Sequence, residues 1–596
     1  MCGLIGNFQL DGRALALDPL RHRGPDAEGS WLSSDHRCWL GHTRLAIQDL
    51  SEAGAQPISS YCGRFTLVFN GEIYNHHQVR QGMRFQAWKG HSDSETLVEG
   101  LAERGPPIVD ELRGMFAFAA YDNQQGQLLL ARDRLGIKPL YVSWHPEGVQ
   151  FASERRALPG GDRLERQTIS QVLAFGHDCT PADFPGPEIK SIVSLPPGML
   201  VRMNHSRLPE TVRYWPPQRR ADWTPLQIQD LRSARICLRR LLEEVVAQHL
   251  QADVPVACFL SSGLDSGILA ALACRQQPGA ITTFTVALPQ SSEDESVLAR
   301  QMANHCNSQH HELVVHEADA LALVKEALSA LDVPTADGIN TYLISRCVAA
   351  EGIKVAISGL GADELFGGYP SHRLMPWLEL VGWLPYPIRV CLLQRLSPRL
   401  ADKLSGLPVW DRWNLGLALR RWASDRTLAA AASEPLRLPL CPPQRISQAW
   451  GQTSWTELFG YAEPMLLRDS DVMSMACGLE LRVPFLDHQL VEFALLIPQR
   501  FQRPGKGLLR QSCADLFPLG HLKRPKQGFV LPMDVWMLGP LREHCLSRLE
   551  SLRQTGWLDP AWIIQQWQAF ESGQLNWPRA WSLVVLGEFA EREFRR

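Results

Sequence analysis

The amino-acid sequence predicts two domains of different fold classes. We expect an N-terminal α+β domain with layered antiparallel sheets and flanking helices, followed by an α/β domain with a doubly wound parallel sheet. The chain has 596 residues, more than a single hydrophobic core accommodates. Up to Glu154, short apolar runs are separated by polar turn clusters, which is typical of layered sheets. From Val254 onward, short apolar runs alternate with helical patterns, which favours a parallel sheet.

The composition excludes several classes of protein. Apolar residues make up 45% of the chain and charged residues 21%, as in ordinary globular domains. The formal net charge of −3 gives no indication of a nucleic-acid or acidic-membrane partner. No uninterrupted apolar run reaches about 18 residues, and the N-terminus lacks the basic segment of an export signal. The 14 cysteines include no Cys-x-x-Cys pair, so we expect buried thiols in a cytoplasmic protein.

The first residues suggest a nucleophile. The chain begins with Met1-Cys2-Gly3, a sequence from which the initiator methionine can be removed. Removal would leave Cys2 with a free α-amino group, whose reference pKa is about 7.7–8.0. This amine can act as the general base for the thiol of the same residue. A single cysteine is more often a packing residue, so the interpretation depends on the motifs that follow.

Four polar, turn-forming clusters follow Cys2 between strand-like runs. They cover residues 22–26, 41–47, 69–75 and 91–95. Together with Cys2, and in this order, they resemble the class II, N-terminal-nucleophile glutamine amidotransferase domain. The resemblance implies that Cys2 is the nucleophile and that the Asn70 side chain and the Gly71 N–H form the oxyanion hole. The implied glutamine-binding residues are Arg44, Leu45, Ile47, Asn70, Gly71, Glu72 and Asp93.

Within this set the resemblance assigns a charge to each end of the substrate. Arg44 would hold the carboxylate of glutamine, while Glu72 and Asp93 would hold its α-ammonium group. Hydrolysis of a carboxamide needs a nucleophile, oxyanion donors and such holding charges. Segments 132–141 and 151–154 match the same family, and we expect them to form scaffold and domain contacts.

Breakers separate the two predicted domains. The sequences Leu195-Pro196-Pro197-Gly198 and Tyr214-Trp215-Pro216-Pro217 are followed by a polar stretch that is typical of a linker. We therefore expect a glutaminase domain over residues 1–195, a linker over 196–234 and a synthetase domain over 235–596. A helical pattern over 231–250 leads into the second domain.

The second domain opens with VPVACFLSSGLDSGILAALACR, residues 254–275, which predicts a strand, a tight turn and a helix. A small-residue turn at a helix N-terminus offers backbone N–H groups to an anion such as phosphate. Asp265, an acid within this anion site, fits Mg²⁺ bound to a polyphosphate. The Walker A spacing is absent. The loop instead resembles that of ATP pyrophosphatases, with Ser262 in place of a glycine, which disfavours a positive φ there.

A second glycine-rich turn follows a later strand. Strands are expected at 254–260, 281–288, 312–315 and 354–357, with helices between them. The last strand ends at Ser358-Gly359-Leu360-Gly361-Ala362-Asp363-Glu364. Because ligands bind at the carboxyl ends of parallel strands, both turns should face one site. There Asp265 and Asp363 could share Mg²⁺.

Over nearly its full length the chain resembles glutamine-dependent asparagine synthetases, whose second domain is adenine nucleotide alpha-hydrolase-like. Segments 468–476 and 480–487 match the helical part of that domain, and 524–529 matches its closing signature. Lys506 matches a catalytic lysine that contacts the phosphates and the leaving pyrophosphate, and Glu364 is implied in acceptor binding. The implied ATP-binding residues are Leu260, Ser261, Ser262, Gly263, Asp265, Ser266, Val286, Ser358, Gly359 and Lys506.

The resemblance implies a reaction with two sites. Glutamine is hydrolysed at Cys2, and MgATP adenylates a carboxylate, by default L-aspartate, which ammonia converts to an amide. The cofactors are ATP, as a co-substrate, and Mg²⁺. The expected partners are glutamine, ATP and the acceptor, with no nucleic acid and no membrane, and homodimers are common in the family.

One departure leaves the acceptor open. Leu360 stands where asparagine synthetases carry a glutamate that assists proton transfer during amide formation. An alternative is therefore the same chemistry on another carboxylate in polysaccharide or secondary-metabolite biosynthesis. A second is an ATP-dependent cyclase of the β-lactam or lasso-peptide kind, and a third is a catalytically inactive binding protein. Cys2 counts against the cyclase, and the near-complete set of acids with Lys506 counts against the inactive protein.

Overall fold

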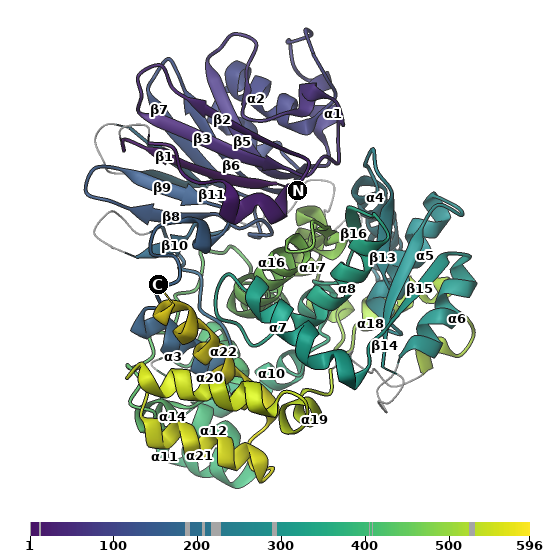
Figure 1. Cartoon of the computed structure of the whole chain (residues 1–596). Coiled ribbons are helices and arrows are strands. Elements are labelled where there is room, and N and C mark those ends of the chain that lie inside the picture. The colour runs from purple at the N-terminus through teal and green to yellow at the C-terminus, as the bar shows by residue number, and fades with distance from the viewer. Residues whose placement is uncertain are drawn as a thin grey trace.

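The computed structural model of the chain describes residues 2–10, 13–184, 191–204, 209–215, 228–288, 295–404, 406–407, 409–523 and 531–595. Two layered antiparallel sheets lie on one side of the molecule, and a parallel sheet with many helices lies on the other (Figure 1). The helices in these ranges include none that is long and apolar enough to cross a membrane.

The N-terminal layers are two six-stranded antiparallel sheets. The first has the order β10-β8-β9-β1-β3-β2 and the second β12-β11-β7-β6-β5-β4. The strands of the first are β1 (Gly3–Phe8), β2 (Ala27–Leu32), β3 (Cys38–Arg44), β8 (Tyr141–Trp144), β9 (Val149–Ala152) and β10 (Ile192–Ser194). Those of the second are β4 (Ile58–Ser59), β5 (Phe65–Ile73), β6 (Gly114–Asp122), β7 (Gln127–Arg132), β11 (Met199–Met203) and β12 (Glu210–Arg213).

Alternating apolar residues hold these layers together. Leu4 of the first sheet and Val68 of the second lie in one buried core. On the opposite face of the second sheet, Leu97 packs against Phe69 and thereby seats the helix α2 (Asp93–Arg104), next to α1 (His76–Gln81). The predicted layered α+β fold is confirmed, and α2 is positioned to carry its first residue, Asp93, over the end of β5.

Strands β11 and β12 correct the linker predicted over 196–234. Leu200 pairs with Ala131 of β7, and Leu200 and Val201 are buried, so these residues extend the second sheet. The breakers at 195–198 form the turn before β11 rather than a domain boundary. Residues 216–227 of the expected linker lie outside the described residues. The predicted helix that follows is confirmed as α4 (Leu231–His249), and the Asp230 side chain caps its first turn.

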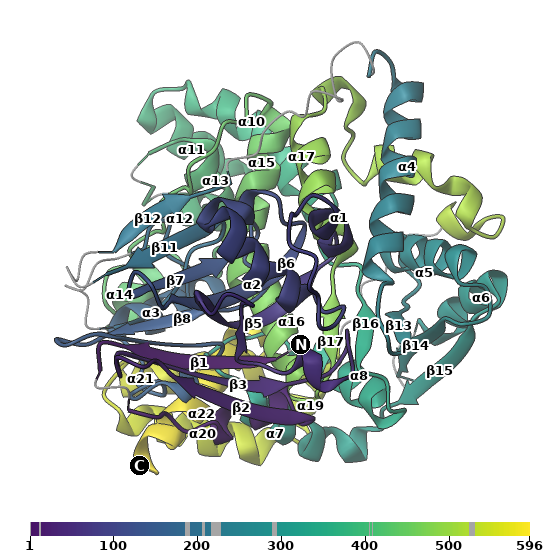
Figure 2. The same cartoon turned by 90° about the horizontal axis from the view of Figure 1, so that it is seen from above.

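The C-terminal sheet has five parallel strands in the order β15-β14-β13-β16-β17. They are β13 (Val256–Phe259), β14 (Thr282–Ala287), β15 (Gln309–Val314), β16 (Val355–Ile357) and β17 (Glu480–Arg482). The helices α5 (Leu264–Gln276), α6 (Ser296–Cys306), α7 (Ala320–Ala330) and α8 (Ile339–Ala350) connect the strands (Figure 2). The predicted doubly wound sheet is confirmed.

Both faces of this sheet are covered. Val348 of α8 shares a core with Ala257 on one face. Val256 and Cys258, which point the other way because side chains alternate along a strand, pack with the larger core that includes Val245 of α4. Burial on both faces explains why the strands are continuous apolar runs rather than alternating ones.

β17 corrects a second expectation. The segment 480–487 was expected in the helical part of the domain, but Glu480–Arg482 forms the fifth strand and Pro484–Leu486 a single 3₁₀ turn. The strand forms because Glu480–Arg482 pairs with β16 in register, Val355 opposite Glu480. Segment 524–529 lies outside the described residues.

Helices make up most of the remaining chain. The helix α3 (Arg166–Phe175) leaves the N-terminal sheets and lies beside the last helix, α22 (Figure 1). The others are α9 (Ala362–Phe366), α10 (Ser371–Gly382), α11 (Tyr386–Leu396), α12 (Pro398–Leu404), α13 (Arg412–Arg420), α14 (Asp425–Ala430), α15 (Ala449–Glu457), α16 (Arg468–Met475), α17 (His488–Leu496), α18 (Gly507–Ser512), α19 (Met533–Leu538), α20 (Arg542–Gln554), α21 (Pro560–Glu571) and α22 (Trp577–Phe594).

Candidate active sites

Cys2 lies at the start of β1 and is 8% exposed. Its backbone N–H donates to Asn70 Oδ1 over 3.1 Å, and its carbonyl accepts a hydrogen bond from Arg23 Nε over 3.2 Å. The backbone N–H of Leu45 faces the sulfur. Residue 2 is therefore held on three sides, as a nucleophile must be to attack in one direction.

Burial raises the pKa of the Cys2 thiol, and the Leu45 N–H and Arg44 lower it only in part. A thiol in this environment is protonated at neutral pH, so attack on a carbonyl needs a base close by. The α-amino group of Cys2, once Met1 is removed, is the base that the sequence predicts.

Asn70 and Gly71, neighbours on β5, have the features of oxyanion donors. Asn70 is fully buried, and its Nδ2 has no hydrogen-bond partner among the described residues. Gly71 has a φ of +155°, and a Cβ there would lie 2.1 Å from the carbonyl oxygen of Met115. A buried donor without a partner in the described part of the chain and a backbone conformation that only glycine allows are both costly features, which are typical of functional sites.

The predicted glutamine-binding residues converge on this point. Arg44 ends β3, and its guanidinium donates to the carbonyls of Asp49 and Ser51. Glu72 follows Gly71 on β5, and Asp93 Oδ2 accepts a hydrogen bond from the Ile73 N–H over 2.8 Å. The structure therefore gathers buried residues near the start of β1, at the ends of β3 and β5 and at the start of α2, and the predicted Leu45 and Ile47 are buried as well.

Two residues of this pocket come from the other domain and were missed as pocket residues by sequence analysis. Arg482 of β17 is fully buried; its Nη2 lies 3.4 Å from Glu72 Oε2, and its Nε donates to Glu480 Oε1 over 2.6 Å. Burial and then the Glu480 charge raise the pKa of Glu72 well above its usual range. Burial raises the pKa of Asp93 to about 6. An ammonium group bound next to these acids would favour their ionised forms and would be stabilised by them in turn.

A cavity of about 330 Å³ lies at the carboxyl ends of β13, β14 and β16. Both glycine-rich turns border it, as predicted. The predicted residues that line it are Leu260, Ser261, Gly263, Asp265, Ser266, Val286, Ser358, Gly359, Asp363 and Glu364. The predicted residue Ser262 does not line the cavity: its N–H donates to Glu295 Oε2, and its carbonyl lies 3.1 Å from His521 Nε2. Ser262 is not among the described residues with a positive φ, so its Cβ is tolerated.

Lys506 reaches the two acids of this cavity. Its Nζ contacts Asp265 and lies 2.8 Å from Asp363 Oδ1. Burial acts to lower the pKa of Lys506, but the two carboxylates outweigh it and raise the pKa. Lys506 has a positive φ of 61°, a strained conformation for a lysine. No cluster of three or more metal-binding side chains occurs in the described ranges, but two carboxylates suffice for an Mg²⁺ that is also bound by phosphates.

Several further residues line the cavity without having been predicted. Asn340 and Thr341 come from the start of α8, and Tyr369 donates a hydrogen bond to Glu364 over 2.8 Å. Burial and then the neighbouring Asp363 raise the pKa of Glu364 to about 7. Leu360 also lines the cavity. Glu295 also lines the cavity. It follows β14 in the sequence, and this position could have revealed it, because residues after the carboxyl ends of parallel strands face the ligand. Asn340 and Thr341 stand in no motif.

Comparison with known proteins matches both halves of the chain. The asparagine synthase family matches residues 237–591, and the glutamine amidotransferase domain family matches residues 1–215. A Mycobacterium tuberculosis protein with the provisional name glutamine-hydrolyzing asparagine synthetase is 30% identical over 603 residues, covering 95% of this chain and 91% of that protein.

Two further relatives show how widely this similarity extends. Asparagine synthetase B of Escherichia coli is 34% identical over 405 residues, covering 63% of this chain and 66% of that protein. Amidase chry2 of Gibberella zeae is 25% identical over 598 residues, covering 89% of this chain and 86% of that protein.

Proposed function

The chain belongs to the asparagine synthase family, and on that premise we propose that it releases ammonia from glutamine at Cys2 and transfers it to a carboxylate that MgATP has adenylated. The default acceptor is L-aspartate, and the products are then L-asparagine, AMP and pyrophosphate. One observation supports this proposal above the others: one chain contains both a buried cysteine next to an amide donor that has no partner among the described residues, and a cavity whose acids Asp265 and Asp363 contact Lys506.

The glutaminase half of the proposal follows from the first pocket. The Cys2 thiol attacks the carboxamide carbon of glutamine and gives its proton to its own α-amine. Asn70 Nδ2 and the Gly71 N–H stabilise the oxyanion of the tetrahedral intermediate. The protonated α-amine then gives this proton to the amide nitrogen, which leaves as ammonia. Water hydrolyses the remaining thioester to glutamate and frees the Cys2 thiol. Glu72 and Asp93 hold the ammonium group of the substrate throughout.

The synthetase half follows from the second cavity. The acceptor carboxylate attacks the α-phosphorus of ATP and pyrophosphate leaves, after which ammonia attacks the acyl carbon, AMP leaves and a proton is released. Asp265 and Asp363 are the residues that would hold Mg²⁺, which neutralises phosphate charge when bound. Lys506 carries a fixed positive charge at the same place and would stabilise the leaving pyrophosphate.

We place the boundary between the two domains after Trp215, because β12 still belongs to the N-terminal sheets and α4 packs with the C-terminal core. Ammonia that escaped to water at neutral pH would be trapped as ammonium, which cannot attack. The proposed reaction therefore needs the two domains to enclose the ammonia between their sites.

Leu360 favours a second candidate, the same chemistry on another carboxylate. Its side chain lines the nucleotide cavity, where it can neither accept a proton nor bind an ammonium group. A relative of similar length is named an amidase rather than a synthetase. A carboxylate other than aspartate is therefore a second candidate acceptor for the same reaction.

The proposal is tested by pyrophosphate release from the purified protein with MgATP and glutamine, with and without L-aspartate, followed by mass detection of asparagine. Aspartate-dependent release together with asparagine supports the default acceptor. Glutamine hydrolysis without a response to aspartate would direct the search to other carboxylates.

A pair of cysteine variants tests the nucleophile. Cys2→Ala should abolish the use of glutamine and keep ammonia-dependent pyrophosphate release. Cys62→Ala, which changes an exposed cysteine of the same domain, should leave both activities unchanged. Glutaminase activity retained in the Cys2→Ala protein would overturn the assignment.

A further inference from the structure

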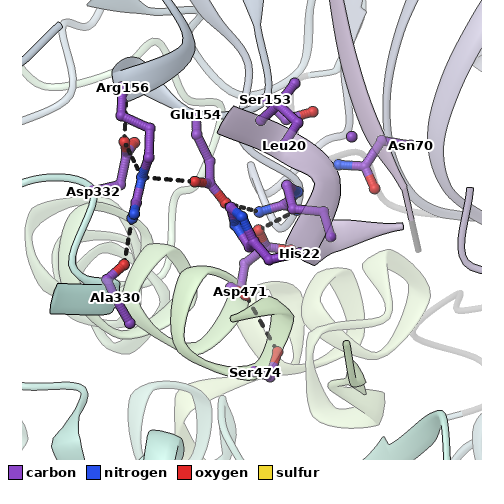
Figure 3. Close-up of polar contacts among 12 residues, drawn as sticks. Leu20, His22, Asn70, Ser153, Glu154, Arg156, Ala330, Asp332, Asp471 and Ser474 are labelled. Atoms are coloured by element: carbon purple, nitrogen blue, oxygen red, sulfur yellow. Dashed lines mark hydrogen bonds and ion pairs between the residues drawn. The ribbon is translucent and has the colours of Figure 1, made fainter. Parts of the chain in front are cut away.

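Arg23 joins the candidate nucleophile to the other domain. Its side chain is fully buried, and each of its three guanidinium nitrogens has one partner. Nε donates to the carbonyl of Cys2 over 3.2 Å, Nη1 to Glu154 Oε1 over 2.8 Å and Nη2 to Asp471 Oδ2 over 2.7 Å. Glu154 follows β9 of the N-terminal domain, whereas Asp471 lies on α16 of the C-terminal domain (Figure 3).

Asp471 is shared between two cations of the glutaminase domain. It is 3% exposed, and its second oxygen, Oδ1, lies 3.3 Å from the Nζ of the buried Lys138. Arg23 has a raised pKa despite its burial, because the charges of Asp471 and Glu154 outweigh the desolvation. The guanidinium is therefore charged, and its orientation is set by carboxylates from both domains.

The helix that carries Asp471 also supports the nucleotide cavity. α16 packs against α8, whose residues Asn340 and Thr341 line that cavity. A Cβ on Gly338, at the start of α8, would lie 3.1 Å from the Met473 side chain of α16, so the two helices are in close contact. Asp471 thus lies on a helix that contacts Arg23 at one candidate site and packs against a helix that lines the other.

We infer that Asp471 is a positioning residue for glutamine hydrolysis: from the synthetase domain, it fixes the Arg23 side chain that holds the backbone carbonyl of Cys2. The inference rests on the proposed role of Cys2 as the nucleophile. Cys2 must present both its α-amine and its thiol to the substrate, so a rotation of its backbone misplaces nucleophile and base together. Asn70 fixes the N–H side of Cys2, and Arg23 fixes the carbonyl side.

The removal of the Asp471 charge leaves the buried Arg23 cation with one neutralising carboxylate fewer. A buried guanidinium that loses a carboxylate is left with uncompensated charge; we expect Arg23 to shift toward Glu154, its remaining carboxylate, at the expense of the hydrogen bond to Cys2, which is the longest of the three. The glutaminase site is therefore complete only when the synthetase domain is docked against it.

The test compares Asp471→Asn with Glu463→Gln. The first keeps the shape of the side chain and removes its charge. The second removes the charge of Glu463, which forms another ion pair across the same interface with Arg132 at 3.0 Å. Both partners of this pair are buried, and the pair does not contact Cys2 or Arg23. Both variants are assayed as full-length proteins for glutamine hydrolysis, an activity that can be measured without knowing the acceptor. Their thermal unfolding midpoints are measured as well.

We expect Asp471→Asn to lower kcat for glutamine hydrolysis about 100-fold, the scale of a 1 Å misplacement of a reacting group, with KM changed less than about twofold. Glu463→Gln should keep kcat within about twofold of the wild-type value, even if it lowers the thermal unfolding midpoint as much as Asp471→Asn does. A second readout is the pH profile of Cys2 alkylation by iodoacetamide, followed on the N-terminal peptide by mass spectrometry, which should change in Asp471→Asn alone.

The inference is overturned by a wild-type kcat in Asp471→Asn, or by an equal loss in Glu463→Gln, which would mean that any damage to the interface suffices. If Asp471→Asn does not fold, Arg23→Lys replaces it: the lysine keeps a charge beside Asp471 but lacks the fork that reaches Cys2, so the same loss of kcat is expected, and a wild-type kcat refutes the inference. Activity in Cys2→Ala would instead overturn the nucleophile assignment, whatever the Asp471 variant does.

Discussion

Alanine in place of Gly71 tests the proposed oxyanion hole most directly. The Cβ that Gly71→Ala adds would lie 2.1 Å from the carbonyl oxygen of Met115 and 2.6 Å from the Cα of Phe116, and both of these are backbone atoms. Cβ atoms essentially never approach another atom within 3.0 Å. The backbone of β5 must therefore move by about 1 Å at this residue, because β6, to which it is paired, cannot give way like a flexible side chain.

The displacement bears on the two groups that would bind the oxyanion. The Gly71 N–H moves with its own backbone, and Asn70 precedes it on the same strand. A misplacement of about 1 Å costs about 100-fold in rate, or about 2.7 kcal/mol of transition-state stabilisation. The loss of one oxyanion donor has a cost of similar size. We therefore expect Gly71→Ala to lower kcat for glutamine hydrolysis by about 100-fold, with ammonia-dependent pyrophosphate release unchanged.

Gly63 provides a matched control. It lies in the turn before β5, also has a positive φ, and a Cβ there would have no atom within 4 Å. Gly63→Ala therefore introduces backbone strain without a collision near Cys2, and it should lower stability slightly while leaving kcat unchanged. Steady-state glutaminase kinetics separate the two variants. A Gly71→Ala protein with wild-type kcat, or an equal loss in Gly63→Ala, would refute the reasoning.

Three further outcomes follow from the two sites. Lys506→Gln should reduce pyrophosphate release by about 100-fold or more and leave glutamine hydrolysis unchanged, because its charge lies at the phosphate site alone; a loss of both activities would contradict this. The kcat/KM for glutamine should show a second fall as the pH is lowered through about 6, below the fall set by protonation of the Cys2 α-amine, because Asp93 then takes up a proton and stops holding the ammonium group; a profile with no steepening below about pH 6 would argue against that role. Arg482→Lys should raise the KM for glutamine several-fold with a smaller effect on kcat, because a lysine cannot bond Glu72, Glu480 and the backbone carbonyls at once; an unchanged KM would exclude a contribution of β17 to the pocket.

The sequence predicted those parts of the molecule whose signals are local. The doubly wound sheet follows from the alternation of apolar runs and helical patterns, and a strand that ends at a glycine-rich turn places Asp265 and Asp363 at one edge of it. Asp265 and Asp363 do meet there, on Lys506. Gly71 belongs to one of the motifs in the sequence, and the structure explains why this position is a glycine: φ is positive, and any Cβ would lie 2.1 Å from a backbone carbonyl oxygen.

Long-range pairing carried no such signal. Arg23 and Asp471 are 448 positions apart, and the contact between Arg482 and Glu72 also crosses the domains. β17 has only three residues and two of them are charged, so neither its length nor its composition indicates a strand. It forms because β16 offers an unpaired edge, which is a property of the assembled sheet. The linker prediction failed for a related reason: prolines and glycines mark a turn equally well inside a sheet and between domains.

The buried ion pairs between the domains are better explained by orientation than by stability. Taking a cation and an anion out of water costs several kcal/mol for each ion, and the attraction between them repays this only with good geometry, so a well-packed apolar contact would hold two domains together at least as well. An apolar contact, however, has no preferred direction and tolerates sliding. Arg23 makes two directed hydrogen bonds within its own domain, to Cys2 and Glu154, and a third to Asp471 across the interface, so the three are made together only when the domains dock in one orientation. A chain that must deliver ammonia from one site to another needs such a fixed position, and this requirement accounts for charges where burial alone would select against them.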